Sequence, residues 1–185
     1  MALLPVLTAA AAAAEPVFDW RFTGPSVPPG VTLYYDTARG AKEGTARMET
    51  DAAAETPWGR GALKVAILET PSGGGKPASE RCWALRLLFS PETRLSAGKV
   101  YRLSATLRAD RETPVTYLSG ATDRGKFRSL SGATERATLG PEWQTVGTAL
   151  TVPAGLAPDA SIMALMVLLG DAPAGATVSV ARVVC

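Results

Sequence analysis

Aromatic and arginine side chains are the residues of this sequence best suited to hold a ligand. Some fall on the polar faces of predicted strands, and others lie near predicted turns, where a ring can project. A flat ring covers the apolar C–H face of a sugar while polar groups bind its hydroxyls. The same residue types also cap cores and face water on ordinary strands, so both interpretations stay open. The candidate ligand-binding residues are Trp58, Arg86, Arg102, Arg108, Tyr117, Phe127 and Arg128.

Catalytic chemistry has little support in the composition. The sequence contains no His and only two Cys, which excludes imidazole general bases, histidine metal ligands and Cys/His zinc sites. The 17 Asp and Glu residues fall mainly in predicted loops and at strand ends, and no spacing singles out a carboxylate pair or a Ser–Lys pair. We therefore predict no enzyme, no metal and no cofactor. A glycan-active enzyme would need loops to bring two carboxylates together.

One glycine-rich segment has some features of a phosphate-binding loop. Residues 72–76 read SGGGK after an apolar run, and clustered backbone N–H groups beside a lysine can hold an anion. Pro77 stands where that loop needs Ser or Thr, the glycine spacing differs, and no helix is predicted to follow. The segment is predicted to be a flexible hairpin loop.

The length of the chain predicts one domain, and its charge argues against a nucleic-acid partner. A chain of 185 residues can bury one sizeable core, so residues 15–185 are predicted to form a single domain. The 19 Lys and Arg residues against 17 acids give a net charge of +2 without a basic cluster. A nucleic-acid partner held through its phosphates is therefore not predicted.

The first residues, 1–14, are predicted to be a signal peptide. Residues 2–14 are uncharged and apolar and end in a run of alanines before Glu15, as in a hydrophobic region with a small-residue cleavage site. No Lys or Arg precedes Arg21, so the usual positive start is missing, and an alanine-rich helix is the alternative. The stretch falls short of the about 20 apolar residues of a membrane span. The expected location is secreted, periplasmic or in the cell envelope.

Cys82 and Cys185 are predicted to form a disulfide, because an even pair of cysteines in an exported chain can close into one bridge. This bridge would tie the last residue to a middle strand. Two unpaired thiols are the alternative.

Alternating hydrophobicity predicts an all-β chain. In residues 100–110, Leu103 and Leu107 fall on one face while Arg102 and Arg108 fall on the other. Residues 161–169 are apolar on both faces, which indicates a covered central strand or a short buried helix. Further strands are predicted at residues 17–22, 31–35, 46–50, 61–68, 83–89, 115–119, 143–152 and 177–184. Without intervening helices, they indicate a jelly-roll β-sandwich of two antiparallel sheets.

Several segments resemble the galactose-binding-like, jelly-roll carbohydrate-binding modules that accompany glycoside hydrolases. The similar segments are 61–65 (GALKV), 95–104 (LSAGKVYRLS), 141–146 (PEWQTV), 150–153 (LTVP), 168–170 (LLG) and 175–178 (GATV). The resemblance implies a β-sandwich that binds polysaccharide without catalysis, with a glycoside hydrolase as its partner. Relatives often bind calcium through Asp residues of the last strand. Residues 178–183 (VSVARV) hold no acid, so no metal is predicted.

Together these patterns predict non-catalytic polysaccharide binding by an exported module. A structural or protein-interaction sandwich of the cell envelope would share the fold and leave its polar face unspecialised. Aromatic residues make up only 6% of the chain, which favours this alternative.

Overall fold

Twelve β-strands in two six-stranded sheets form most of the computed structural model, which describes residues 15–185. The predicted signal peptide, 1–14, lies outside the described residues. Sheet A contains β1 (Asp19–Arg21), β3 (Ala46–Thr56), β4 (Gly59–Ile67), β6 (Val100–Ala109), β10 (Gln144–Thr151) and β12 (Thr177–Val184). Sheet B contains β2 (Val31–Tyr35), β5 (Leu85–Phe89), β7 (Thr113–Asp123), β8 (Lys126–Ser129), β9 (Glu135–Leu139) and β11 (Ser161–Leu168).

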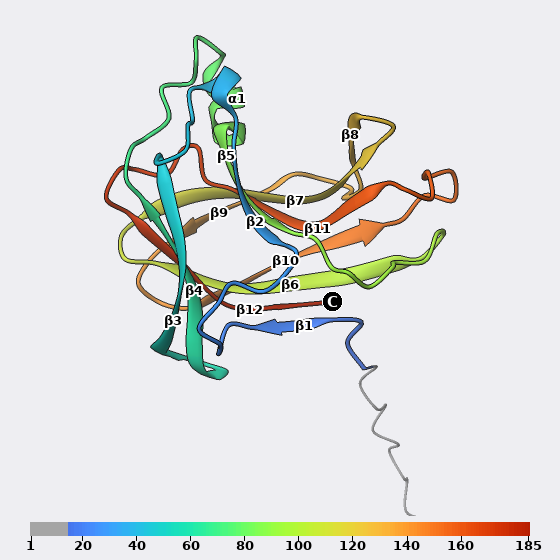
Figure 1. Cartoon of the computed structure of the whole chain (residues 1–185), viewed down its shortest axis with the longest axis horizontal. Helices are drawn as coiled ribbons and strands as arrows, with labels where there is room; N and C mark the ends of the chain where they lie inside the picture. The colour runs from blue at the N-terminus through green and yellow to red at the C-terminus, as the bar shows by residue number, and fades with distance from the viewer. Residues whose placement is uncertain (1–14) are drawn as a thin grey trace, which may run out of the picture.

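The strands of each sheet pair antiparallel, and the two sheets stack face to face (Figure 1). Sheet A has the order β10-β6-β12-β4-β3, and β1 pairs with β12 beyond the end of β4. Sheet B has the order β2-β5-β11-β7, and β9 and β8 share the far edge of β7. The helical segments are η1 (Thr37–Arg39), α1 (Ala78–Arg81) and η2 (Cys82–Ala84). The predicted two-sheet jelly-roll β-sandwich is confirmed.

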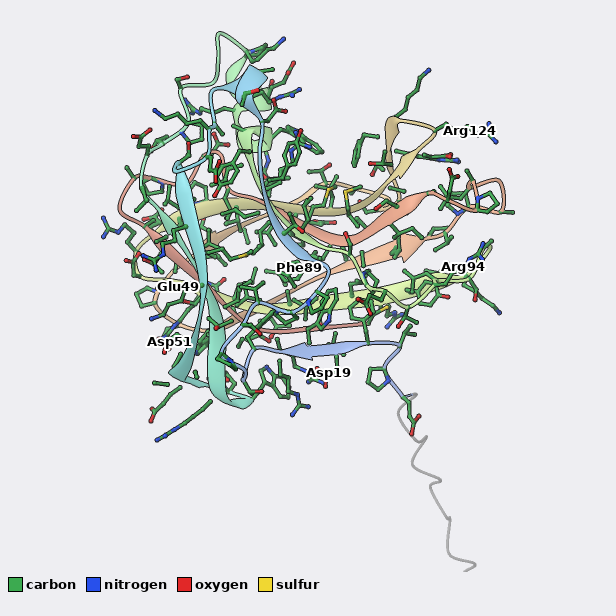
Figure 2. All side chains as sticks on the ribbon, in the orientation of Figure 1. Asp19, Glu49, Asp51, Phe89, Arg94 and Arg124 are labelled. Atoms are coloured by element: carbon green, nitrogen blue, oxygen red, sulfur yellow. The ribbon has the colours of Figure 1, made fainter. Side chains whose placement is uncertain are left out.

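The core lies between the sheets because alternate side chains of each strand point inward. In β6, Leu103 and Leu107 are buried while Arg102 and Arg108 face outward, as predicted. Phe89 of β5 lies between the layers and packs near Phe22 and Trp20 (Figure 2). The largest fully buried side chains are Phe22, Phe89, Leu63, Ile67, Leu85, Leu87, Leu107, Leu118, Leu139, Leu150, Leu165 and Met166.

Strand β11 is the covered central strand that its two apolar faces predict, and the helix alternative is wrong. Its inward residues Leu165 and Val167 belong to the main core, while Met166 and Leu168 lie in a second cluster on the outer side of sheet B. A register shift between Met163 and Met166 interrupts its pairing with β7. At this bulge the consecutive residues Ala164 and Leu165 both join inner clusters, while Met163 and Met166 lie on the outer side.

The sequence pattern misplaced Trp83. Residues 83–89 were expected to form one strand, with Trp83 on the same face as Leu85 and Leu87. The strand begins instead at Leu85, and Trp83 lies in η2. The 3₁₀ turn has about three residues per turn rather than the period of two of a strand, so it rotates the indole to the outer side of sheet B.

The glycine-rich segment is not the predicted hairpin loop, because it connects β4 of sheet A to α1 and then to β5 of sheet B. Gly74 has a φ of +56°, and a Cβ there would lie 2.4 Å from the Ala38 carbonyl oxygen. The loop therefore packs closely against η1. Strands β8 and β9 and the segment formed by α1 and η2 were not predicted.

The predicted disulfide is wrong, since Cys82 and Cys185 are both free. Cys82 packs on the outer side of sheet B, whereas Cys185 follows the last strand of sheet A. Stacked sheets lie about 10 Å apart, beyond the roughly 7 Å Cα separation that a disulfide tolerates. Backbone hydrogen bonds with Val17 and Phe18 hold Cys185 in place instead.

Replacing Phe89 with Ala is expected to lower the free energy of unfolding by about 3–5 kcal/mol, because it leaves a cavity between the sheets. Phe127→Ala is the matched control, since Phe127 is 47% exposed, and should cost about 1 kcal/mol or less. Urea titrations of both variants test this. Equal losses would contradict the assigned core.

Two thiols should react with an alkylating agent when the unfolded protein is kept free of reductant. In the folded protein, burial raises the pKa of the Cys82 thiol and slows its reaction. Mass spectrometry of alkylated samples, with a pre-reduced sample as the control, measures both. If the protein gains the mass of the alkylating groups only after reduction, the two cysteines form a disulfide and this assignment is wrong.

Candidate functional site

The seven candidate residues do not form one site, because they lie on different faces of the sandwich. Trp58, Arg102 and Arg108 are on the outer face of sheet A, and Arg86 and Phe127 are on the outer face of sheet B. Arg128 lies on the side of β8 opposite Phe127. Tyr117 is 8% exposed and packs in the core, so its ring is not available as a platform. Tyr117 points inward because it alternates with Thr116 and Leu118, which face outward.

The outer face of sheet A is covered by contacts within the protein. Trp58 donates a hydrogen bond from Nε1 to Thr106 Oγ1 at 3.1 Å, and the Arg182 guanidinium stacks 4.3 Å from the Trp58 ring centre. Arg182 also pairs with Asp19 at 2.7 Å. Arg108 stacks in the same way over Trp143, at 4.5 Å. Each of these two aromatic rings therefore has an arginine stacked on it, and ion pairs between strands lie around Trp58.

The outer face of sheet B has an apolar floor and two raised walls. The floor consists of Leu118, Met163, Met166 and Leu168. Figure 1 shows α1 and β8 standing on the same side of the β7 and β11 layer, away from β1 and β12. Trp83 from the first wall meets Phe127 from the second edge to face, with ring centres 5.4 Å apart. Gly120 leaves the room for Phe127, because a Cβ there would lie 2.4 Å from the ring.

An aromatic and guanidinium stack stands beside this floor. The Arg86 guanidinium lies 4.5 Å from the centre of the Tyr34 ring and 5.7 Å from that of Trp83. Arg86 Nε donates to the Trp83 carbonyl oxygen at 2.8 Å, and a terminal nitrogen donates to Asp36 at 2.6 Å. Tyr34 is 45% exposed, so part of the stack faces solvent.

Asp36 is the buried carboxylate that holds this stack. Arg39 donates to the same oxygen at 2.7 Å and continues to Glu80 at 3.1 Å. Burial opposes the charge of Asp36, but the hydrogen bonds and positive charges of Arg39 and Arg86 outweigh it and lower the pKa of Asp36 from its ordinary value of 3.8. The carboxylate is thus ionised at neutral pH and fixes Arg86 between the two rings.

Strand register places outward-facing residues of sheet B in a straight row, in which Leu168 and Thr116 are buried and Tyr34 and Arg136 are exposed. Tyr34 pairs with Arg86, Arg86 with Leu168, Leu168 with Thr116, and Thr116 with Arg136. Directly paired residues point to the same side of a sheet, so the row crosses five strands, roughly 19 Å at the usual strand spacing. Its β9 end opens into a groove of about 600 Å³ lined by Cys82, Thr116, Arg136, Thr138 and Asp171, among others.

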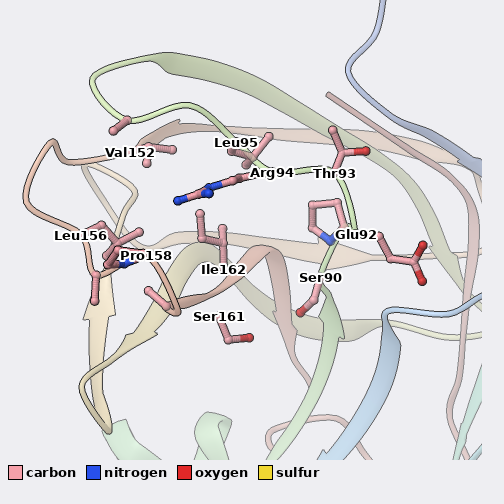
Figure 3. A pocket seen from close by; sticks show the side chains of 14 residues that line it. Ser90, Glu92, Thr93, Arg94, Leu95, Val152, Leu156, Pro158, Ser161 and Ile162 are labelled. Atoms are coloured by element: carbon pink, nitrogen blue, oxygen red, sulfur yellow. The ribbon is translucent and has the colours of Figure 1, made fainter.

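A second pocket, of about 310 Å³, lies at the edge of the sandwich between the β5–β6 and β10–β11 loops. Its walls include Leu95, Val152, Leu156 and Ile162, and Figure 3 shows Arg94 extending across it toward Leu156. No aromatic ring lines this pocket. It therefore has no flat surface for a sugar ring, and the outer face of sheet B is the better candidate.

Metal ligands and membrane spans were also sought in residues 15–185. This part of the chain brings no three Cys, Asp or Glu side chains together in a way that could hold a metal ion. Its helices are too short and too polar to cross a membrane.

Comparison with solved structures identifies the fold. The xylan-binding CBM22-1 domain of Paenibacillus barcinonensis Xyn10C aligns over 95% of this chain and 96% of its own, with a TM-score of 0.61 and 14% identity. The chain has the fold of carbohydrate-binding modules. The ligand-free CBM1 module of BiXyn10A aligns over 92% of this chain and 97% of its own, with a TM-score of 0.60 and 12% identity.

A third carbohydrate-binding module with this fold is joined to an enzyme. The CBM22-1 and GH10 modules of the Clostridium thermocellum xylanase Xyn10B, in complex with xylohexaose, align over 93% of this chain and 28% of theirs, with a TM-score of 0.57 and 8% identity. The sequence matches no protein-family model and no curated protein.

Several residues of the sheet B face escaped the sequence analysis. Trp83 was assigned to the core by its even spacing from Leu85, and Tyr34 was seen only as part of a strand. Asp36 and Arg136 had no local signal. Their partners Arg86 and Thr116 lie far away in sequence, and only the pairing of the strands joins them.

Asp36→Asn is expected to lower stability by about 1–3 kcal/mol at pH 7, because Arg39 and Arg86 lose a charged partner. The folded pKa of Asp36 lies below the unfolded one, so the stabilisation is complete above the unfolded value and disappears as the pH falls through the folded one. Urea titrations at pH 7 and below pH 4 should show the difference from the original protein shrinking.

Glu49→Gln is the control for this prediction, because Glu49 forms an exposed pair with Arg47. It should change stability by less than about 1 kcal/mol. A pH-independent cost of Asp36→Asn would contradict the charged role of Asp36.

Proposed function

We propose that this chain is a non-catalytic glycan-binding module that holds a polysaccharide across the outer face of sheet B. The observation that carries this proposal is the Arg86 guanidinium held between the Tyr34 and Trp83 rings at the end of a row that crosses the sheet. Rings provide apolar cover for sugar C–H groups, and guanidinium and hydroxyl groups bind sugar oxygens. An extended face suits a chain of linked sugars better than a closed pocket does.

Preorganisation supports the same proposal. Arg86 is held by Asp36 and by the Trp83 carbonyl, so little side-chain freedom remains to be lost when a ligand binds. The apolar floor beneath Trp83 and Phe127 keeps those rings in place. The fold of known carbohydrate-binding modules adds an argument by analogy.

We further propose that the module works outside the cytosol beside a glycoside hydrolase. The predicted export signal at residues 1–14 supports this location. A module of the same fold is joined to a GH10 module in the Clostridium thermocellum xylanase, which supports this partner.

A protein-interaction role is the second candidate, and it would use the other face. Trp58 is 45% exposed on the outer face of sheet A, among ion pairs that include Arg182 and Asp19. Exposed tryptophan beside arginine is typical of protein interfaces. This role predicts that substitutions on sheet A affect function and that those on sheet B do not.

Affinity electrophoresis in gels containing xylan, β-glucan, mannan or pectin tests the proposed binding. Retardation on at least one glycan is expected, and Trp83→Ala should weaken it by about 2 kcal/mol, or roughly thirtyfold in Kd. Tyr34→Ala provides a second test, because this exposed ring can be removed with little effect on folding. Trp58→Ala is the matched control and should bind normally.

Circular dichroism and urea titration should accompany these variants, so that a loss of binding is separated from a loss of fold. Migration unaffected by every glycan would overturn the proposed function. Binding that is lost in Trp58→Ala and kept in Tyr34→Ala would move the site to sheet A.

A further inference from the structure

The groove at the β9 end of the sheet B row contains a guanidinium without an acidic partner. Arg136 is exposed, lines the groove and forms no ion pair with any residue from 15 to 185. Thr116 lies opposite Arg136 in the strand register, and Thr138 lies on the same side of β9. The Arg136 guanidinium and the side chains of Thr116 and Thr138 thus line the same groove.

The carboxylates of the α1 wall and of the stack beside it are all engaged with arginine. The ion pairs are Asp36 with Arg39 at 2.7 Å and with Arg86 at 2.6 Å, Glu80 with Arg39 at 3.1 Å, and Asp171 with Arg81 at 2.9 Å. These pairs neutralise one another within the α1 wall and the stack beside it. Arg136 therefore faces the groove without an ion-pair partner among residues 15–185, while its neighbour Glu135 points to the opposite side of β9.

The buried thiol at the groove wall responds to both charges of the groove. Burial raises the pKa of Cys82, Asp171 raises it further, and Arg136 lowers it. Asp171, Arg136 and Cys82 line the same groove, and both charges lie close enough to act on the thiol. Because Arg81 already pairs with Asp171, an anion entering the groove meets Arg136 without competition from a free carboxylate.

We propose that Arg136 makes this face select acidic polysaccharides, by binding a carboxylate or sulfate group of one sugar in the groove. This inference rests on the proposed glycan-binding function and names its ligand class. Arginine binds a planar carboxylate through two parallel charge-assisted N–H···O bonds, which are stronger than the bonds it forms with the neutral hydroxyls of a sugar. The Tyr34 and Arg86 stack, roughly 14 to 19 Å away along the row, would hold a further sugar of the same chain.

Affinity electrophoresis at two salt concentrations tests the ligand class. Polygalacturonate supplies carboxylates, a sulfated galactan supplies sulfates, and xylan stripped of its acidic branches supplies neither. The original protein should be retarded at least about tenfold more strongly by one acidic glycan than by the neutral one, and salt should reduce the difference. The acidic glycan that retards the protein shows whether the bound group is a carboxylate or a sulfate.

Arg136→Gln should remove this preference for acidic glycans, whereas Arg136→Lys should keep part of it. Arg102→Gln is the matched control, because Arg102 is an exposed and unpaired arginine on the opposite sheet. Thermal unfolding should be the same for all four proteins.

Two results would overturn the inference and keep the proposed function. One is equal retardation by neutral and acidic glycans, and the other is an acidic preference that survives in Arg136→Gln. If the protein binds none of these three glycans and none of the glycans in the broader set above, both the proposed function and the inference are overturned.

Discussion

Burial of the two inner sheet faces against each other is the constraint on which this structure depends. Each strand presents alternate side chains to opposite sides, so burial of Leu103 and Leu107 sends Arg102 and Arg108 outward. A shift of one residue in register would place arginines in the core, which makes the pairing highly specific. The same constraint fixes which residues stand next to each other on the outer faces. The row from Tyr34 to Arg136 is a consequence of core packing.

The two outer faces use this placement differently. On sheet A, Arg182 stacks on Trp58 and Arg108 stacks on Trp143, ion pairs lie around Trp58, and Trp58 remains 45% exposed. On sheet B, the strand β11 carries apolar residues on both sides and therefore needs cover outside as well as inside. Trp83 and Phe127 help to supply this cover, and they leave the Phe127 ring partly exposed and a groove beside Leu168. The surplus hydrophobicity of one strand thus produces the face that we assign to ligand binding.

Asp36 links stability to the shape of this face. Its carboxylate is buried, which is unfavourable for a charge, and two arginines compensate. One of these arginines, Arg86, is held beside the Tyr34 and Trp83 rings as a result. The buried ion pair thus limits the movement of the side chains in the face that we propose for ligand binding.

The sequence alone determined the fold class, because alternation of apolar and polar residues is a local property. It located ten of the strands, and it identified β11 as central from its two apolar faces. Segments 126–129 and 135–139 escaped because they are short, mostly polar edge strands: the first is exposed throughout, and the second buries only Leu139 and part of Ala137. The tertiary structure decided the site. Tyr34 meets Arg86, and Thr116 meets Arg136, only through pairing between distant strands, and a single 3₁₀ turn moved Trp83 from the core to the surface. The separation of Cys82 from Cys185 has the same origin, since sheet assignment depends on the whole chain and local spacing carries no record of it.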